Sequence, residues 1–404
     1  MNTIYVVGMG MSPHDLLPEG LAVLREADTL AGGRRHLEEC SWHKGGKLVL
    51  KGSVDKWLDE VGAWAEKGTV AVLASGDPGF YGILRRLTGR FGSVNLKVMP
   101  GVTTVQAAFA RLRLSWDQAG IVSLHGRPLD CLWQFLSSHD QVAIFTDREN
   151  TPNRIAEALL QKGLANWGIT VLEDLGRESE KVRKLDLEQA SLLEFSPLNL
   201  VILSRLKPGR PLSLGLDEAF FEHAKGMITK KEVRAVALAK LSLKPGQILW
   251  DLGAGSGSVG IEASLLLPGG RVEAVEKNSA RVDQIKANQA RFEVGCLTVH
   301  EGEIMEIIPG LPRPDRVFVG GAGKDLAGII AQVSSYLRPG GLVVASTVLM
   351  DSMIQARKAM TSLGFEVDLI QVQVSRGEPL AHDLRLVPLN PVWLITGQSK
   401  PCGE

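Results

Sequence analysis

Short apolar segments alternate with amphipathic helical segments along most of this chain. Strands are predicted at residues 4–7, 69–73, 141–145 and 199–203, and helices at 16–27, 54–67 and 153–162. Strands that alternate with helices in this way form layers in which helices cover a sheet. The sequence therefore predicts an α/β fold.

The alternation breaks near residues 204–216. The segment Lys207-Pro208-Gly209-Arg210-Pro211 is rich in turn-forming residues and has no apolar period. Because 404 residues also exceed a typical single domain, we expect one domain at 1–205, a linker at 206–217 and a second domain at 218–404. In the second domain, helices are predicted at 231–241 and 259–266, and strands at 247–252, 271–275, 297–300, 315–319, 342–346, 366–374 and 390–396.

The composition excludes several classes of protein. Lys plus Arg and Asp plus Glu both number 45, so there is no net basic charge of the kind that nucleic-acid binding needs. The four cysteines form no C-x-x-C pair, and His36, Cys40 and His43 lack a nearby fourth ligand, so we predict no metal site. No apolar segment is long enough to span a membrane, and residues 1–10 resemble a strand more than a signal peptide. We expect a cytoplasmic protein.

The strongest local motif is D-L-G-A-G-S-G, from Asp251 to Gly257. It lies between a predicted strand and a predicted helix, where glycines allow a tight turn and close approach of a ligand. Glu276 ends the next strand, and a carboxylate there can accept hydrogen bonds from both ribose hydroxyls of a nucleoside. The loop and the acid together predict a nucleoside site.

The identity of the nucleoside is left open by the loop itself. Gly255, Gly257 and Gly260 also satisfy the dinucleotide spacing G-x-G-x-x-G. Two features favour S-adenosylmethionine: Asp251 can lie near the cationic methionine end, and a helix precedes the first strand. A nicotinamide-dependent oxidoreductase and a nucleoside-binding regulatory module stay as alternatives, as does a methyltransferase of another large substrate.

Three glycine turns follow predicted strands in the first domain. They are V-V-G-M-G-M-S-P from Val6, A-S-G-D-P-G-F-Y-G from Ala74 and M-P-G-V-T-T from Met99. Each turn is weak evidence, since many strands end in glycine. Three of them at three strand ends suggest one ligand trough where the strand order reverses.

These motifs resemble two methyltransferase families. The three turns, with S-L-H-G-R from Ser123, resemble the tetrapyrrole methylases, which are class III S-adenosylmethionine enzymes. Residues 218–404 resemble their small class I partners through G-M-I-T-K-K-E-V-R from Gly226, the Asp251–Gly257 loop and V-G-G-A-G from Val319. The opening loop reads G-M-G-M-S-P where related methylases often have G-x-G-P-G, so it is expected to bend differently or to hold the cofactor less tightly.

The resemblance implies a class III methylase of two α/β subdomains fused to a class I Rossmann-like methyltransferase. It implies methylation of precorrin-6B, or of its cobalt form, at C-5 by residues 1–205 and at C-15 by residues 218–404. The second domain would also remove the carboxyl group of the ring C acetate, as a step of cobalamin biosynthesis. Two S-adenosylmethionine sites per chain and a homo-oligomer follow from the same resemblance.

The resemblance also implies the cofactor-binding residues. In the first domain they are Gly8, Gly10, Gly76, Asp77, Pro78, Gly79, Phe80, Pro100, Gly101, Thr103, Thr104, Leu124 and Thr146. In the second domain they are Thr229, Asp251, Gly253, Ala254, Gly255, Ser256, Gly257, Glu276, Glu303 and Ile304.

A substrate with many carboxylates needs cationic partners, and its decarboxylation needs a proton donor. The candidate cations are Lys225, Lys230, Lys231, Arg234 and Arg376, and the candidate proton donors are His223 and His382. From these we predict Arg376, His382 and Lys231 as the catalytic residues. Arg376 lies in a predicted glycine-proline turn, where it is expected to grip a substrate carboxylate. The alternative is a surface arginine that pairs with Glu378 or Asp383.

Overall fold

The computed structural model describes residues 2–209, 212–224, 226–321 and 325–400. The chain divides by its internal contacts into two compact units, which are described separately. The first unit contains Met1–Arg127, Gln141–Asn153 and Ile169–Ser204, and the second contains Pro128–Asp140, Arg154–Gly168 and Arg205–Glu404.

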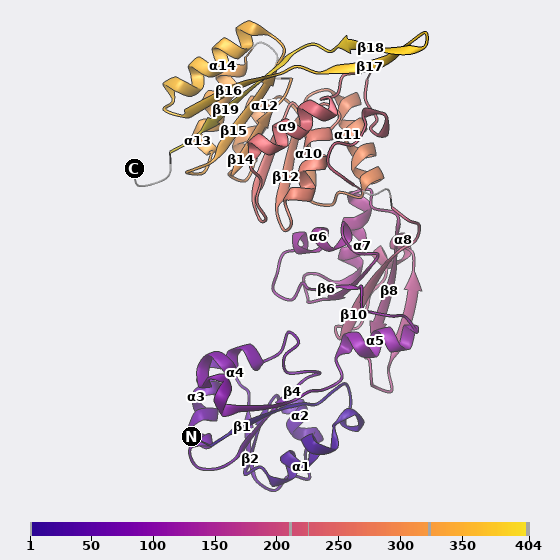
Figure 1. Ribbon diagram of the computed structural model, residues 1–404. Helices are drawn as coiled ribbons and strands as arrows, with labels where there is room; N and C mark the ends of the chain where they lie inside the picture. The colour runs from indigo at the N-terminus through magenta and orange to yellow at the C-terminus, as the bar shows by residue number, and fades with distance from the viewer. Residues whose placement is uncertain (1, 210–211, 225, 322–324, 401–404) are drawn as a thin grey trace. The chain divides into compact units, whose positions relative to one another are not determined.

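The first sheet of the chain is fully parallel, in the order β3-β2-β4-β1-β5 (Figure 1). Its strands are β1 (Ile4–Gly8), β2 (Thr29–Gly32), β3 (Gly46–Val49), β4 (Val70–Ala74) and β5 (Leu96–Met99). Its helices are α1 (Pro18–Glu26), α2 (Arg34–Glu39), α3 (Val54–Ala65), α4 (Leu84–Phe91) and α5 (Thr104–Leu112). Because the strands are parallel, their carboxyl ends meet at one edge, where the three glycine turns begin.

The second sheet is mixed, in the order β6-β7-β10-β8-β9. Its strands are β6 (Gly120–Ser123), β7 (Gln141–Phe145), β8 (Trp167–Glu173), β9 (Lys181–Leu185) and β10 (Asn199–Arg205). The helices in this stretch of sequence are α6 (Trp133–Leu136), α7 (Pro152–Gln161) and α8 (Leu187–Ser191).

The third sheet has seven strands, in the order β13-β12-β11-β14-β15-β19-β16. They are β11 (Ile248–Leu252), β12 (Arg271–Glu276), β13 (Leu297–Glu301), β14 (Arg316–Val319), β15 (Leu342–Thr347), β16 (Glu366–Val372) and β19 (Val392–Gln398). Five are parallel, and β19 runs antiparallel to both of its neighbours. The strand order reverses between β11 and β14, and such a switch point is where open α/β sheets bind ligands.

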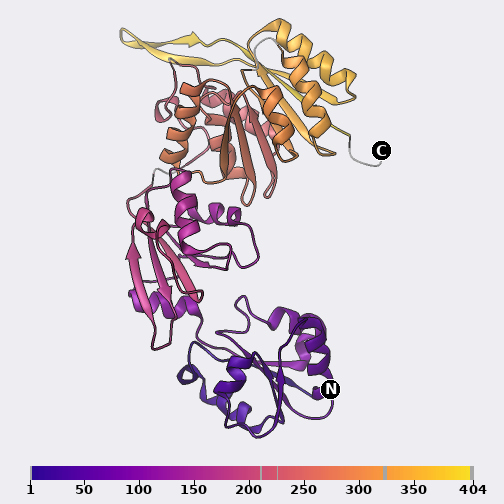
Figure 2. The same ribbon diagram turned by 180° about the vertical axis from the view of Figure 1, so that it is seen from behind.

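The helices of the C-terminal half flank this sheet (Figure 2). They are α9 (Lys231–Leu241), α10 (Ser258–Ala263), α11 (Ser279–Phe292), α12 (Ile304–Ile307), α13 (Leu326–Tyr336) and α14 (Met350–Ser362). Short 3-10 helices in the chain are η1 (Pro13–Asp15), η2 (Ser93–Asn95), η3 (Leu129–Leu132), η4 (Glu218–Phe220), η5 (Ser264–Leu266) and η6 (Ile308–Gly310). Helix α9 precedes β11, as the sequence predicts.

The glycine-proline turn predicted after Arg376 is wrong. Residues 375–380 form strand β17 (Ser375–Leu380), which pairs with β18 (Asp383–Pro388) as an antiparallel hairpin. The strand tolerates Pro379 because a two-stranded ribbon has two free edges, on which a missing N–H costs no ladder bond. The turn instead consists of Ala381, whose φ is 52°, and His382.

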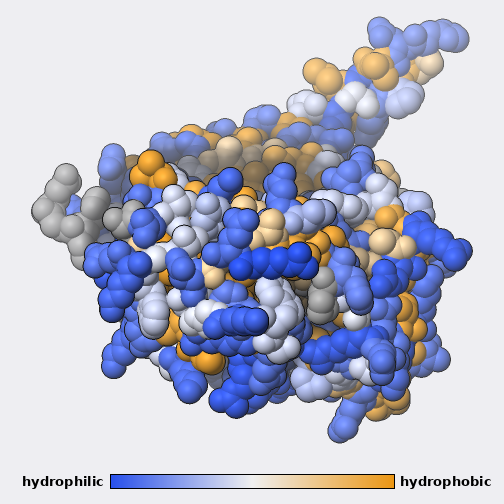
Figure 3. Space-filling view, turned by 90° about the horizontal axis from the view of Figure 1, so that it is seen from below, coloured by the Kyte–Doolittle hydropathy of each residue, from blue (hydrophilic) through white to orange (hydrophobic). Residues whose placement is uncertain are grey.

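The hairpin has an apolar face and a polar face. Gly377 lies opposite Leu386, and Pro379 opposite Leu384, while Glu378 and Arg385 pair on the other face. Leu384 and Leu386 are 67% and 73% exposed. The two strands extend beyond the sheet to which they are attached, and hydrophobic residues lie among the hydrophilic ones on this arm (Figures 1 and 3).

Within the described ranges, no helix is both long and apolar enough to cross a bilayer. The same ranges contain no group of three or more His, Cys, Asp or Glu side chains arranged to hold a metal ion.

Candidate active sites

The glycine loop after β11 is held between two neighbouring elements. Gly253, Gly255 and Gly257 all have positive φ angles, of 70°, 60° and 74°. A methyl group on Gly253 would overlap the carbonyl oxygen of Gly320, and one on Gly257 would lie 2.9 Å from the side chain of Ile285. A methyl group on Gly255 would meet no atom within 4 Å. The loop is therefore closely packed on both flanks and open at its centre.

Two buried acids support this loop. The carboxylate of Glu276 accepts hydrogen bonds from the N–H groups of Gly255, at 2.9 Å, and Asn278, at 3.0 Å. Asp251 accepts the N–H of Gly260 through Oδ2 at 2.9 Å, while its Oδ1 is buried and has no hydrogen-bond partner among the described residues. Burial, with the nearby charge of Glu276, raises the pKa of Asp251 to about 7. An unpaired buried carboxyl oxygen is costly, so a polar ligand atom would satisfy it.

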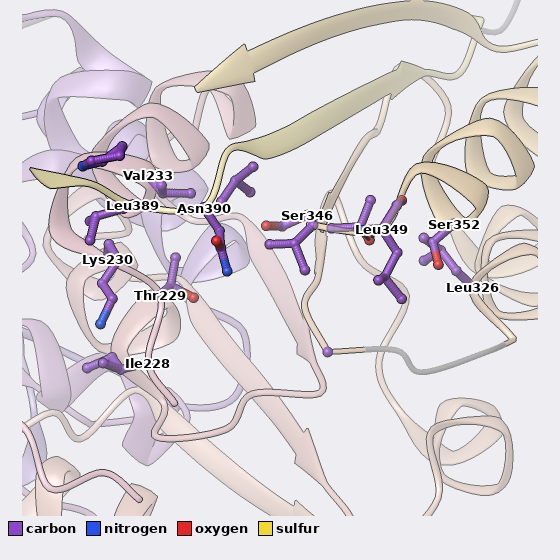
Figure 4. A pocket seen from close by; sticks show the side chains of 15 residues that line it. Ile228, Thr229, Lys230, Val233, Leu326, Ser346, Leu349, Ser352, Leu389 and Asn390 are labelled. Carbon is purple, nitrogen blue, oxygen red and sulfur yellow. Dashed lines mark hydrogen bonds between the residues drawn. The ribbon is translucent and has the colours of Figure 1, made fainter. Parts of the chain in front are cut away.

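A cavity of about 860 Å³ lies beside the loop, at the carboxyl ends of β14 and β15. Gly321 lines it, and the Cβ position of Gly321 is 3.7 Å from the carbonyl oxygen of Gly253. The remaining lining comes from the residues before α9 and its first turn, the start of α13, the end of β15 with the start of α14, and residues 388–392 (Figure 4). We name this space the C-terminal cavity. Its described lining residues are Ile228, Thr229, Lys230, Val233, Gly321, Leu326, Ser346, Thr347, Val348, Leu349, Ser352, Pro388, Leu389, Asn390 and Val392.

The three glycine turns of the first unit come together at one edge of the parallel sheet. Gly10 and Gly76 form an isolated antiparallel bridge, and the N–H of Gly76 donates to the carbonyl of Gly10 at 3.1 Å. A methyl group on Gly8 would lie 2.6 Å from the amide nitrogen of Gly101 and 2.7 Å from the carbonyl oxygen of Gly76. Only glycine allows three backbones to approach this closely, so the turns form one structure.

Side chains of the same turns fix their shape. Asp77 accepts the N–H of Gly79 at 2.8 Å and that of Gly101 at 3.2 Å. Thr103 caps α5 by accepting the N–H of Gln106 at 3.1 Å. Its neighbour Thr104 donates to the sulfur of Met11 at 3.4 Å. The opening loop has Met11 and Ser12 where related methylases often have proline and glycine. Asp15 holds this part of the loop, because its carboxylate accepts the N–H groups of both residues at 2.9 Å.

A cavity of about 1040 Å³ opens beside these turns, and we name it the N-terminal cavity. Gly10, Gly76, Asp77, Phe80, Thr103, Thr104 and Thr146 line it together with five arginines, Arg35, Arg85, Arg86, Arg127 and Arg177. Leu124 is fully buried, and the hydroxyl of Thr146 donates to Asn199 at 2.8 Å. Asp77 is the one carboxylate among the described lining residues, although three of the arginines pair with acids outside the lining, namely Arg35 with Glu39, Arg86 with Asp55 and Arg177 with Asp174.

His36 is a buried member of this lining. Its Nε2 lies 3.0 Å from Nη2 of Arg35 and 3.2 Å from Oγ of Ser75. Burial, with the adjacent Arg35 guanidinium, lowers the pKa of His36 to about 4. A guanidinium can only donate, so Nε2 accepts, and neutral His36 fixes the direction of Arg35.

Comparison with known proteins locates the chain in a family. Residues 3–191 match the tetrapyrrole (corrin/porphyrin) methylases, and residues 219–397 match the precorrin methyltransferase domain. A Sinorhizobium protein, precorrin-6Y C(5,15)-methyltransferase [decarboxylating], is 34% identical over 384 residues, which cover 93% of this chain and 91% of that protein. The chain belongs to the decarboxylating precorrin-6Y C(5,15)-methyltransferases.

Two further relatives extend this result. The Mycobacterium tuberculosis protein of the same name is 30% identical over 409 residues, which cover 97% of this chain and 99% of that protein. A probable cobalt-precorrin-6B C(15)-methyltransferase (decarboxylating) of Pyrobaculum aerophilum is 37% identical over 185 residues, which cover 45% of this chain and 94% of that protein. The predicted family and α/β fold are confirmed: this is a decarboxylating methyltransferase of corrin biosynthesis.

In this precorrin-6Y methyltransferase, the predicted cations have different surroundings. Arg234 is fully buried and pairs with Glu262 at 2.7 Å, so it is part of the core. Lys231 pairs with Asp217 at 3.3 Å and does not line the C-terminal cavity. Lys230 does line it. Lys225 lies outside the described residues.

Arg376 contacts two acids from other elements. Its guanidinium makes two hydrogen bonds of 2.9 Å to Glu218 and one of 2.8 Å to Glu232. The hydrogen bonds from Arg376 hold the pKa of Glu218 at about 2, helped by the N–H of Lys231. Of the two partners that the alternative expects, Glu378 accepts a hydrogen bond from Arg385, and Asp383 accepts the N–H of Leu384.

The predicted histidines and two predicted cofactor residues are absent from the described lining of the C-terminal cavity. His382 is exposed in the hairpin turn, and the ring of His223 accepts the N–H of Gly226 at 3.2 Å. Neither histidine lines the C-terminal cavity. Glu303 pairs with Lys277 at 3.3 Å, and Ile304 begins α12. Thr229, another predicted cofactor residue, does line the cavity.

Sequence reasoning did not select several lining residues. Arg35 and His36 lie in the first turn of α2, just after β2, and Ser346 to Leu349 run from the last two residues of β15 into the segment after it, so each group lies at the carboxyl end of a parallel strand. That position was a usable signal, because such loops line the ligand edge. Asn390 carries no comparable signal, since only the return of the chain from the hairpin brings it to the cavity.

Proposed function

We propose that the chain methylates precorrin-6B, or its cobalt form, at C-5 with residues 1–205 and at C-15 with residues 218–404. The second domain also removes the carboxyl group of the ring C acetate, and residues 206–217 connect the two. The observation that carries this proposal is that each unit has its own cavity next to its own glycine turns. Gly10 and Gly76 line the N-terminal cavity, and Gly321, whose Cβ position is 3.7 Å from the carbonyl oxygen of Gly253, lines the C-terminal cavity. The Pyrobaculum relative, named for the C(15) reaction with decarboxylation, supports a separate domain for that step.

The C-terminal site fits S-adenosylmethionine. When bound, this cofactor supplies a methyl group on a sulfonium. The open centre of the loop at Gly255 leaves space for a nucleoside, Glu276 lies beside it for the ribose, and the unpaired Oδ1 of Asp251 is an acceptor for the methionine ammonium. The remaining proposed contacts are Thr229, Gly253, Ala254, Ser256, Gly257, Glu303 and Ile304.

The N-terminal site fits a second molecule of the same cofactor. The backbones at Gly8 and Gly101 leave no room for side chains, and Gly76, which touches both, lines the N-terminal cavity. The remaining proposed contacts are Gly10, Asp77, Pro78, Gly79, Phe80, Pro100, Thr103, Thr104, Leu124 and Thr146. Two cofactor sites per chain follow.

The residues of both cavities act by positioning a reactive substrate. The meso carbons of the macrocycle are electron-rich, so alignment and exclusion of water dominate the rate. In decarboxylation, the bond between the acetate methylene and its carboxyl carbon breaks, CO2 leaves and the electron pair enters the conjugated ring. The methylene carbon then takes up a proton and becomes a methyl group. His382 stays a predicted proton donor.

The chain also self-associates in this proposal, through the apolar face of the hairpin. An isolated two-stranded hairpin is only marginally stable in water, and Leu384 and Leu386 lie exposed on one face of it. A second copy presents the same face, so two hairpins can cover each other. Replacing both leucines with serine should shift the wild-type oligomer to the monomer in sedimentation, and an unchanged oligomer would exclude this contact.

Titration calorimetry with S-adenosylhomocysteine tests the two-site proposal. We expect a stoichiometry near two per chain for the wild type. A value of one would show that one half does not bind the cofactor. Mass spectrometry of the products from precorrin-6B and labelled S-adenosylmethionine then assigns each methyl group to a half.

A further inference from the structure

The C-terminal cavity has a single charged side chain in its described lining. Lys230 is that residue, and no carboxylate accompanies it there. Leu326, Val348, Leu349 and Val392 supply apolar surface, and the polar groups are neutral hydroxyls and one amide. Figure 4 shows Lys230 on one part of the wall, among Thr229, Asn390 and the apolar Ile228, Val233 and Leu389, and Leu326 and Leu349 on another part, with the neutral Ser346 and Ser352.

The neighbouring cations are each neutralised by an acid. Lys231 pairs with Asp217, and Arg376 pairs with Glu218 and Glu232. The ammonium of Lys230 instead makes a long contact of 3.4 Å to the carbonyl of Gly226. No salt bridge to Lys230 occurs in the part of the chain that the structure describes, although its charge contributes to the low pKa of Glu218 after the bonds from Arg376. Two donors of its ammonium are therefore free for a ligand.

The backbone of Lys230 is fixed from two sides. It is the N-cap residue of α9, and its carbonyl accepts the N–H of Arg234 at 2.8 Å. The next N–H, of Lys231, donates at 2.8 Å to Glu218, the acid that Arg376 grips. Arg376 thus links the base of the hairpin to the start of α9, and both segments border the cavity.

We propose that Lys230 binds a carboxylate of the tetrapyrrole that the reaction retains, and that Arg376 is a positioning residue for it. This inference rests on the proposed function of the second domain. A cation on the departing carboxylate would stabilise the charged state relative to neutral CO2 and oppose its loss. Binding of a retained carboxylate at Lys230 directs the departing acetate to the apolar wall, where a carboxylate is poorly solvated. The lysine therefore selects which carboxylate is lost.

The test compares Lys230→Met with Lys240→Met in the full-length protein. Lys240 lies in the last turn of the same helix and pairs with Asp368 at 2.6 Å, away from the cavity. For Lys230→Met, we expect the KM for precorrin-6B in C-15 methylation and decarboxylation to rise roughly ten- to a hundredfold, as for loss of a charged hydrogen bond. Its kcat, its C-5 methylation and its S-adenosylhomocysteine affinity should stay near wild type. Lys230→Arg should restore most of the KM, and Lys240→Met should match wild type.

The outcomes separate this inference from the function on which it rests. If the wild type itself shows no C-15 methylation, the proposed function fails. If the wild type is active and Lys230→Met has an unchanged KM, only the role of Lys230 fails. If instead the kcat for decarboxylation falls in Lys230→Met while the KM is unchanged, Lys230 acts at the reacting carboxylate and the proposal is overturned. Equal thermal transitions of the two methionine variants show that folding does not cause the difference.

Discussion

The two cavities differ in charge although the chain as a whole is neutral. Five arginines and one carboxylate line the N-terminal cavity, whereas one lysine and no carboxylate are found among the described lining residues of the C-terminal cavity. We propose that both receive the same polyanionic substrate. Arg35, Arg86 and Arg177 of the first cavity also pair with acids outside its lining, but the first cavity still offers more cations to the carboxylates of the substrate than the second. The second is also the one to which we assign the loss of a carboxylate.

The two sites nevertheless share one structural device. In each, glycine turns at the carboxyl ends of parallel strands touch backbone to backbone, although the two sheets have different strand orders. We propose that this close backbone contact prepares the cofactor side of each site, and that the charged side chains distinguish the substrate sides. Substitutions in one site test this comparison when the activity or the cofactor affinity of both sites is measured.

The largest effect is expected from a methyl group in either glycine contact. In Gly253→Ala the new methyl overlaps the carbonyl oxygen of Gly320, and in Gly101→Ala it overlaps that of Gly76. Gly253→Ala should reduce C-15 methylation and decarboxylation by at least about a hundredfold, since the clash adds to strain at a positive φ. Gly101→Ala should do the same to C-5 methylation. Mass spectrometry of the products measures both losses. A single substitution that abolishes C-5 and C-15 methylation together would contradict independent sites.

Removal of the carboxylate of Glu276 is expected to have the next largest effect. Glu276→Ala should weaken S-adenosylhomocysteine binding at the C-terminal site by about 1–3 kcal/mol, the value of hydrogen bonds to a charged group. The N-terminal site should keep its affinity. Calorimetry then shows one weakened and one unchanged site, whereas unchanged affinity at both would refute the assignment of Glu276 to the ribose.

Variants of Arg376 distinguish two roles for this residue, a direct clamp on the substrate and the positioning of Lys230. Arg376→Lys cannot reproduce the two-pronged bond to Glu218, so C-15 methylation and decarboxylation should fall together by about tenfold, with C-5 methylation and cofactor affinity retained. Glu218→Gln should have the same effect, and the double variant should be no worse than either single one. If Glu218→Gln is fully active, Arg376 acts on the substrate directly.

The two units should respond in opposite directions to acid. The pKa of His36 is about 4 in the folded chain against an ordinary 6.5, so between these values the unfolded chain binds the extra proton and the first unit loses stability as pH falls. The pKa of Asp251 is about 7 against 3.8, so the folded chain binds the proton and the second unit gains stability as pH falls from 7.

Each contribution should be on the order of 1–3 kcal/mol. Thermal unfolding from pH 7 to pH 4 measures it. His36→Gln should remove part of the acid sensitivity of the first unit, and Asp251→Asn should remove part of the gain in the second. If the dependence of unfolding stability on pH is unchanged in these variants, other groups cause it.

The sequence by itself determined the order of elements and the ligand edges of the sheets. Buried strands such as β4, and helices such as α3 with its buried Trp57, Leu58, Val61 and Ala65, follow from local hydrophobic periods. The turns from Gly8, Gly76 and Gly253 were found because a strand that ends in glycines carries its own signal. For the same local reason the family was recognised from short motifs.

Only the tertiary structure decided which charges face the substrate. Lys230 and Lys231 are neighbours of the same type in the sequence, yet one lines the cavity and the other pairs with Asp217. Arg376 looked like a free arginine in a turn because its partners Glu218 and Glu232 lie 158 and 144 positions away. Local patterns encode the backbone, whereas the pairing of a charge depends on long-range contacts that the fold brings together. The sequence therefore predicted the glycine turns of both units, and the structure shows which charged residues line the cavities beside them.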